Sequence, residues 1–226
     1  MKIKEILLFT NELPKQKKFF ESVLGFDLLE EASYRFSIQV GWTKLVFQKS
    51  RENYKYHYCF LIPSNKLEEA IIWLSKKTNL VKIEKERVIQ YFENWNAHAI
   101  YFYDGAGNLA EFIVRHNLKN ESQKNFDLSQ ILGVNEIGMP TNDIRKINQE
   151  IEKDTGSNFW KGNKEIFGTN GTPEGLFLLV NNEIKKTWFP TEMFTQSSPF
   201  EISITVNQKN YFIKFKNQEI VKIKKG

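Results

Sequence analysis

Apolar segments recur in the same order along this chain, and that repetition limits the folds open to it. The run IKEILLF (residues 3–9) is followed by a polar break, by apolar residues at helical spacing between Leu13 and Leu24, and by short segments of strand type. The order restarts with YHYCFLI (residues 56–62) and again, less completely, with VNEIGM (residues 134–139). The sequence therefore predicts repeated units of one strand, one helix and further strands.

Two of the predicted helices have recognisable ends. Gly25 follows the first helical stripe, where a residue free to adopt positive φ favours a helix end. Asp143 precedes a stripe of isoleucines in the third unit and suits an N-cap, and Gly156 follows that stripe. We therefore expect one helix to end at Gly25 and another to run from Asp143 to near Gly156.

Segments of strand composition fill the second unit and the end of the chain. In the second unit they are residues 80–87, 88–95, 98–104 and 109–115, with a turn at DGAGN (residues 104–108) because its glycines permit positive φ. Near the end they are residues 175–182, 200–206, 211–215 and 219–223, with no helix among the last three. GTNGTPEG (residues 168–175) lacks the spacing of a phosphate-binding loop, and we interpret it as a turn.

The composition is that of a packed globular protein. Of 226 residues, 41% are hydrophobic and 14% aromatic, which excludes a disordered chain. The formal charge is only +5 and the basic residues are scattered, so we expect no nucleic-acid partner. No apolar stretch approaches the roughly 18 residues of a membrane helix. The first residues lack the features of a secretory signal, and Cys59 is the single cysteine, so we expect a cytoplasmic protein with no membrane contact.

The repeat also predicts a division of the chain. Residues 1–118 would form a domain of two units, the polar stretch at residues 119–130 a linker, and residues 131–226 a third unit with a truncated fourth. We expect a monomer or a loose homodimer, because the extra units provide pairing within one chain.

Three stretches resemble the vicinal-oxygen-chelate superfamily, which includes glyoxalase I, bleomycin-resistance proteins and extradiol dioxygenases. They are NELPKQKKFFESVLGF (residues 11–26), YHYCFLIPSNKLEEAIIWL (residues 56–74) and IYFYDGAGNLAEFIVR (residues 100–115), whose turn and glutamate are the most specific. The resemblance implies an α+β fold of repeated βαβββ modules, with curled mixed sheets around a cavity. One pair of modules would be full and a second pair partial.

The resemblance also implies a metal site. In the superfamily the metal ligands lie on the first and last strands of paired modules, and Glu5, His57 and Glu111 stand at such positions here. Strand alternation places each of the three on a face with apolar neighbours. Two carboxylates and an imidazole suit Mn, Fe, Ni or Zn. The alternatives from the residues alone are a surface glutamate at Glu5, a capping imidazole at His57, and a Glu111 carboxylate paired with Arg115.

The match to the family pattern is incomplete. The last strand of the first module, TKLVFQ (residues 43–48), has no carboxylate, so the four-ligand set of glyoxalase I is not met. The His, His, Glu set of extradiol dioxygenases is not met either, because Glu5 replaces one histidine. Glu136 holds in the third module the place of Glu5 in the first, and we interpret it as a vestige or a hydrogen-bonding group.

Two functions follow from the resemblance, and a third from the added units. The first is a metal-dependent lyase or ring-cleaving dioxygenase acting on a small oxygenated molecule in the N-terminal cavity. The second is a metal-free binding protein of the bleomycin-resistance type, with Trp42, His98, Tyr101 and Tyr103 as candidate ligand-binding residues. The third is an interaction protein. Aromatic residues near Trp188 would pack the added units against the first, or cover a ligand.

Overall fold

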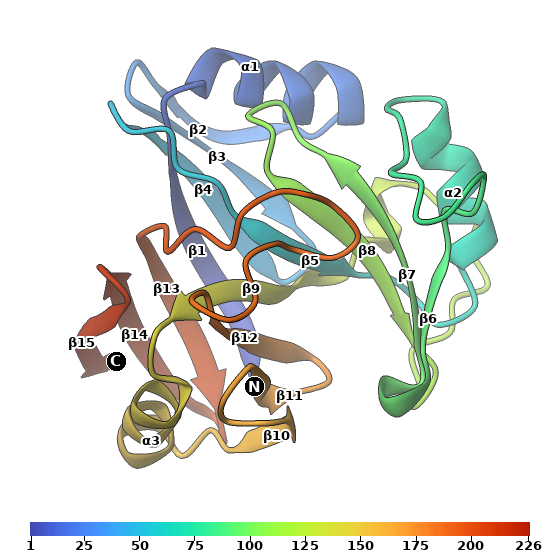
Figure 1. The fold of residues 1–226 in the computed structure, drawn as a ribbon. Coiled ribbons are helices and arrows are strands. Elements are labelled where there is room, and N and C mark those ends of the chain that lie inside the picture. The colour runs from blue at the N-terminus through green and yellow to red at the C-terminus, as the bar shows by residue number, and fades with distance from the viewer.

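The computed structural model describes residues 1–226 and consists of two mixed sheets with three helices packed against them (Figure 1). Sheet A has seven strands in the order β15-β14-β13-β1-β4-β3-β2, and sheet B has eight in the order β10-β11-β12-β9-β5-β8-β7-β6. The strands of sheet A are β1 (Lys2–Thr10), β2 (Leu28–Ala32), β3 (Arg35–Val40), β4 (Thr43–Lys49), β13 (Phe200–Val206), β14 (Lys209–Lys216) and β15 (Glu219–Lys225). Those of sheet B are β5 (His57–Leu61), β6 (Gln90–Phe92), β7 (Ala97–Tyr103), β8 (Leu109–Arg115), β9 (Gly133–Thr141), β10 (Phe159–Gly162), β11 (Phe167–Thr172) and β12 (Gly175–Asn181).

Sheet B is a full pair of modules formed by the second and the third, whereas the repeat predicted the first and the second as the full pair. Sheet A combines the first module with the last three strands of the chain. In each module of sheet B the first and last strands are parallel neighbours, β5 with β8 and β9 with β12, and the two modules meet where β5 runs antiparallel to β9. The predicted α+β fold of repeated βαβββ modules is confirmed.

The modules do not pair in chain order. The second module pairs with the third in sheet B, while β1 of the first module pairs with β13 in sheet A. Strands from both sides of residues 119–130 therefore share each sheet. The division of the chain into domains at that segment stays a prediction.

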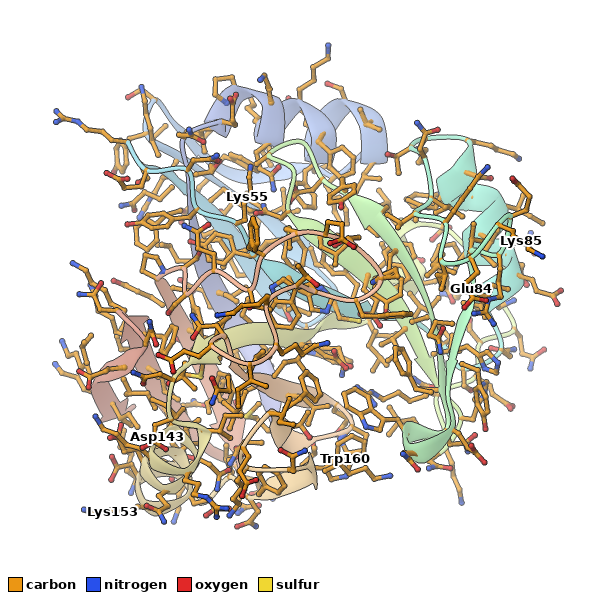
Figure 2. All side chains as sticks on the ribbon, in the orientation of Figure 1. Lys55, Glu84, Lys85, Asp143, Lys153 and Trp160 are labelled. Atoms are coloured by element: carbon orange, nitrogen blue, oxygen red, sulfur yellow. The ribbon has the colours of Figure 1, made fainter.

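The helices end where the sequence predicted. The first is α1 (Leu13–Lys18), continued by a wider π-helical segment, η1 (Phe19–Leu24), to Gly25 at φ 97°. The others are α2 (Leu67–Ser75) and α3 (Ile144–Thr155), where Asp143 accepts a hydrogen bond from the Lys146 amide and Gly156 follows at φ 74°. Figure 2 shows Asp143 and Lys153 near opposite ends of α3. None of these helices is long and apolar enough to cross a membrane.

The turn at residues 104–108 is also confirmed, and it supports the strand that carries Glu111. The Asp104 carboxylate accepts hydrogen bonds from Gln16 Nε2 and Tyr58 Oη, both at 2.6 Å, and from the Asn108 amide at 2.9 Å. These bonds join the turn to α1 and β5, so β8 leaves the turn in register with β5.

Two local predictions were wrong, one of a strand and one of a turn. Residues 80–87 make only isolated bridges, Leu80 with Phe102 and Glu84 with Arg87, because exposed charged residues give this stretch no apolar face to bury. Residues 168–175 are not a turn throughout, since β11 extends to Thr172 and the chain reverses only at residues 173–174. A glycine is needed at position 168, because a β-carbon there would lie only 2.5 Å from the Phe159 ring.

Strand alternation gives sheet B two different faces. On β5, Tyr58 and Phe60 point into the main apolar core, which also holds residues of sheet A such as Ile6 and Phe47. His57, Cys59 and Leu61 point to the other face, where a smaller apolar cluster lies. The buried residues His57, Glu111 and Glu136 lie on this second face.

Candidate metal centre and cavity

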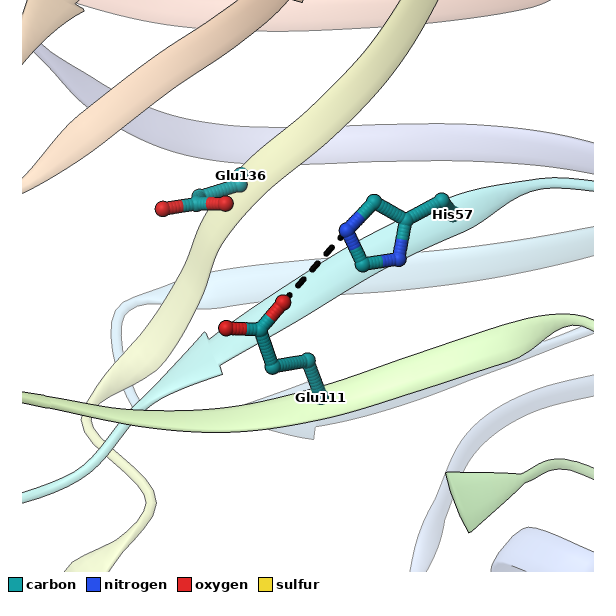
Figure 3. A group of neighbouring side chains, drawn as sticks. All are labelled: His57, Glu111 and Glu136. Atoms are coloured by element: carbon teal, nitrogen blue, oxygen red, sulfur yellow. Dashed lines mark ion pairs between the residues drawn. The ribbon is translucent and has the colours of Figure 1, made fainter. Parts of the chain in front are cut away.

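Three buried side chains converge on the second face of sheet B. They are His57 on β5, Glu111 on β8 and Glu136 on β9, and their potential ligand atoms all lie within 4.8 Å of one another (Figure 3). The Nε2 atom of His57 lies 3.4 Å from Oε2 of Glu111. Carboxylates this close in a buried place repel each other unless a proton or a cation lies between them.

The strand register explains the convergence. Cys59 on the central strand β5 pairs with Glu111 on one side and with Glu136 on the other. Both glutamates therefore flank the same small residue and can extend over it, while His57 lies on the same face two residues earlier. Burial raises the pKa of the Cys59 thiol, so this residue is a neutral spacer beneath the carboxylates.

The His57 ring is oriented by the backbone. Its Nδ1 atom lies 3.1 Å from the Leu109 carbonyl oxygen, which can only accept, so Nδ1 carries a proton and donates it. In the neutral ring Nε2 then has a free lone pair facing Glu111. A proton on Nδ1 is the tautomer that a metal ligand binding through Nε2 requires. The Trp188 ring lies beside this imidazole, with 4.8 Å between ring centroids.

Glu136 is held by a buried arginine. Arg115 Nη2 donates to Glu136 Oε1, and Arg115 Nε donates to Asn135 Oδ1 at 3.1 Å. The guanidinium also lies 5.3 Å from the Trp95 ring and 5.5 Å from the Trp160 ring. Burial raises the pKa of Glu136 to about 7, and the positive charge of Arg115 opposes that rise.

A cavity of about 220 Å³ opens beside the three ligands. Its remaining walls are Phe92, Trp95, Tyr101, Phe167, Leu178, Lys185, Trp188 and Phe189. Lys185, Trp188 and Phe189 belong to residues 182–199, the segment between β12 and β13 that crosses over this part of sheet B (Figure 1). We call residues 182–199 the strap.

One wall residue occupies the place of a fourth ligand. In the module of β5 and β8, His57 pairs with Leu109 and Glu111 lies two residues later. In the module of β9 and β12, Glu136 pairs with Leu176, and Leu178 lies two residues later. Leu178 is therefore the counterpart of Glu111, and it supplies no donor.

The structure brings together two of the three predicted ligands, His57 and Glu111, but not Glu5. Glu5 is exposed in sheet A, where β1 pairs with β4 and β13 rather than with β5. The expectation that Glu5 joins the other two is wrong because the first module pairs with the last strands of the chain. Glu136, interpreted as a vestige or a hydrogen-bonding group, holds the third place and does bond to Arg115.

Of the predicted ligand-binding residues, only Tyr101 lines this cavity. Trp42 lies instead over Gly133, and Lys2 lies 4.8 Å from its ring. His98 contacts His116, with 2.7 Å between ring nitrogens. Tyr103 is 41% exposed. Because side chains alternate along β7, His98 lies on the face opposite to Tyr101 and Tyr103 lies at the strand end.

Lys185 and Phe92 line the cavity although no pattern in the sequence indicated them. The aromatic residues near Trp188 were expected to pack the added units or to cover a ligand, and the structure shows Trp188 at the cavity wall against His57. The repeat itself held a signal for Glu136, since this residue opens the third module as His57 opens the second.

The three donors fit a divalent metal ion. The set offers one imidazole nitrogen and carboxylate oxygens, which suits Mn, Fe, Ni or Zn. The fixed tautomer of His57 and the small Cys59 between the glutamates are consistent with such a site. Arg115 occupies one oxygen of Glu136, which leaves the other oxygen of that carboxylate free to bind.

Comparison with known proteins agrees with this fold. Residues 2–112 match the model of the glyoxalase/bleomycin resistance protein/dioxygenase superfamily. A putative dioxygenase from Bacillus subtilis is 14% identical, with a TM-score of 0.61 over 95% of this chain and 81% of the other. A glyoxalase I mutant from Zea mays is 11% identical, with a TM-score of 0.54 over 80% of this chain and 68% of the other.

No curated protein sequence matches this chain. The two solved structures nevertheless share its fold over most of its length. The first half of the chain is therefore similar to the glyoxalase/bleomycin resistance protein/dioxygenase superfamily, and the two solved structures share the fold of the chain.

Proposed function

We propose that this protein binds a divalent metal ion through His57, Glu111 and Glu136 and acts on a small oxygenated molecule in the adjoining cavity. The convergence of three buried donors within 4.8 Å carries the proposal. A divalent ion would remove the repulsion between the two carboxylates. When bound, it would supply an electrophile for oxygen atoms of the substrate, which a lyase or a ring-cleaving dioxygenase requires.

The protein's own residues would prepare the site. The Leu109 carbonyl orients His57, and Arg115 positions Glu136. Aromatic side chains such as Trp188 and Tyr101 would hold the organic part of the substrate and exclude water from it. With three protein ligands and Leu178 in the fourth place, coordination positions would stay open for substrate.

The direct test is metal binding by matched glutamine variants. Purified protein would be analysed for metal content and titrated calorimetrically with Mn²⁺, Ni²⁺ and Zn²⁺. We expect Glu111→Gln to abolish uptake and Glu5→Gln, at the exposed glutamate of sheet A, to leave it unchanged. His57→Ala should weaken affinity by about two orders of magnitude. A wild-type protein that takes up no metal at millimolar concentration would refute the proposal.

A second candidate function is metal-free binding of a small molecule. The ion pair between Arg115 and Glu136 favours it, because it compensates one buried carboxylate without a metal. A proton shared between His57 and Glu111 would compensate the other. In that case ligands would quench tryptophan fluorescence in protein treated with a chelator, and Glu111→Gln would bind them as wild type does.

Three sequence-based expectations accompany the proposal. They are a cytoplasmic location, a monomer or loose homodimer, and a small molecule rather than nucleic acid as the partner. Light scattering measures the assembly, and each of the three stays a prediction.

A further inference from the structure

Lys185 is a cation of the cavity wall with no partner in the protein. It is half-buried, on the strap, and the only lysine or arginine among the residues that line the cavity. Its Nζ atom makes no hydrogen bond or ion pair with any residue. The two cavity carboxylates have other partners, since Glu111 contacts His57 and Glu136 contacts Arg115.

The charges of the cavity cancel once both glutamates are ionised, as metal binding requires. Ionised Glu111 and Glu136 contribute two negative charges, and Arg115 and Lys185 contribute two positive ones. A divalent ion on the triad would leave an excess of two positive charges. Beside the buried carboxylates such an excess is unfavourable, because water screens it only in part. Lys185 would therefore oppose binding of the metal alone.

We propose that this cavity binds an anionic oxygen ligand together with the metal, and that Lys185 couples the two. The inference rests on the proposed function, because it assumes the metal on the triad. The anion would restore neutrality and contact Lys185, so each partner would tighten binding of the other by the same factor.

The cavity also limits the class of anion. Aromatic rings surround it, among them Phe92, Tyr101 and Trp188, and its volume of about 220 Å³ lies below the usual range for drug-sized ligands. A small carboxylate with a flat apolar body fits both observations. A phosphate or an extended polar chain would leave the aromatic walls without a partner.

The experiment compares the metal affinity with and without two probes of matched shape. Benzoate is charged and benzamide is neutral. Calorimetric titration with Mn²⁺ or Zn²⁺ would be done without probe, with benzoate and with benzamide. We expect benzoate to tighten metal binding by about tenfold, within the usual range of coupling between sites, and benzamide to leave it nearly unchanged.

We expect the Lys185→Met variant to change metal affinity in two opposite ways, depending on whether benzoate is present. Removing the positive charge should tighten binding of metal alone by several-fold and remove most of the gain from benzoate. Lys186→Met is the matched control, because this neighbouring lysine is exposed and does not line the cavity. It should behave as wild type. A general loss of folding would weaken both measurements and so would not reproduce this signature.

The outcomes separate the inference from the proposed function. Metal uptake by wild type, with Lys185→Met indistinguishable from Lys186→Met, would overturn the role of Lys185 and leave the metal site intact. Equal effects of benzoate and benzamide would overturn the preference for an anion. Absence of metal uptake by wild type would overturn the proposed function and, with it, the coupling.

Discussion

Arg115 and Glu136 form an ion pair that is almost fully buried, with side chains 1% and 2% exposed. The pair joins the second module to the third, because Arg115 ends β8 and Glu136 lies in β9. The Arg115 guanidinium lies 5.3 Å from the Trp95 ring, and the Glu136 carboxylate lies near the ligand atoms of His57 and Glu111. Stability and the proposed metal binding would therefore depend on the same residues.

Replacing Arg115 should expose this dependence. Arg115→Met leaves the Glu136 carboxylate buried and unpaired, and we expect a loss of about 3–5 kcal/mol in the free energy of unfolding, measured with urea. Arg145→Met is the control, since its ion pair with Glu165 is exposed and should contribute about 1 kcal/mol or less. Adding Mn²⁺ should restore part of the loss in Arg115→Met. Equal losses in the two variants would contradict the prediction.

The stability of the metal-free protein should fall as the pH rises from about 4.5 to about 7. Burial raises the pKa of Glu136 from its ordinary 4.5 to about 7, so in this window the folded protein keeps a proton that the unfolded chain releases. The folded state then binds more protons, and rising pH favours unfolding. Thermal unfolding across this range measures the effect.

Glu136→Gln isolates that contribution, because its side chain does not titrate. The variant should show a flatter dependence of unfolding free energy on pH between 4.5 and 7. An unchanged slope would assign the dependence to another group. Metal uptake by wild type should strengthen over the same range, since a ligand must lose its proton to bind.

Leu178→His should strengthen the metal site, because this position is the counterpart of Glu111 and faces the cavity. A fourth donor should raise the affinity for Zn²⁺ by about tenfold or more and lower metal-free stability by about 2 kcal/mol. Leu176→His is the control, since Leu176 is equally buried in β12 but does not line the cavity. It should lose stability without any gain in affinity.

Gly138→Ala should displace the strap. A β-carbon at Gly138 would lie 2.6 Å from the Trp188 ring, which would have to move away from His57. We expect a stability loss of about 1–3 kcal/mol from overpacking and a shift in tryptophan emission. Adding Trp188→Phe should recover part of the loss, because the smaller ring leaves room. Additive losses would show that the two residues do not compete for space.

Local patterns in the sequence determined the modules and much of their detail. Periodicity placed the helices, Gly25 and Gly156 marked two of their ends, and Asp104 to Asn108 marked the turn before β8. Alternation along each strand placed His57 and Glu111 on faces with apolar neighbours, and both residues are buried in the structure. These features depend on residues a few positions apart, whose geometry is set by backbone sterics and hydrogen bonding within one element.

The tertiary structure alone decided which modules pair, and so whether Glu5 or Glu136 completes the triad. The backbone hydrogen bonds at a strand edge are the same whichever strand pairs there. By these bonds alone, β5 could pair with the first strand of either the first or the third module, and it pairs with β9 of the third. Burial of complementary apolar faces selects the pairing, and that is a property of the assembled core. The same long-range packing lays the strap over sheet B and brings Lys185 and Trp188 beside His57, more than a hundred residues earlier in the chain.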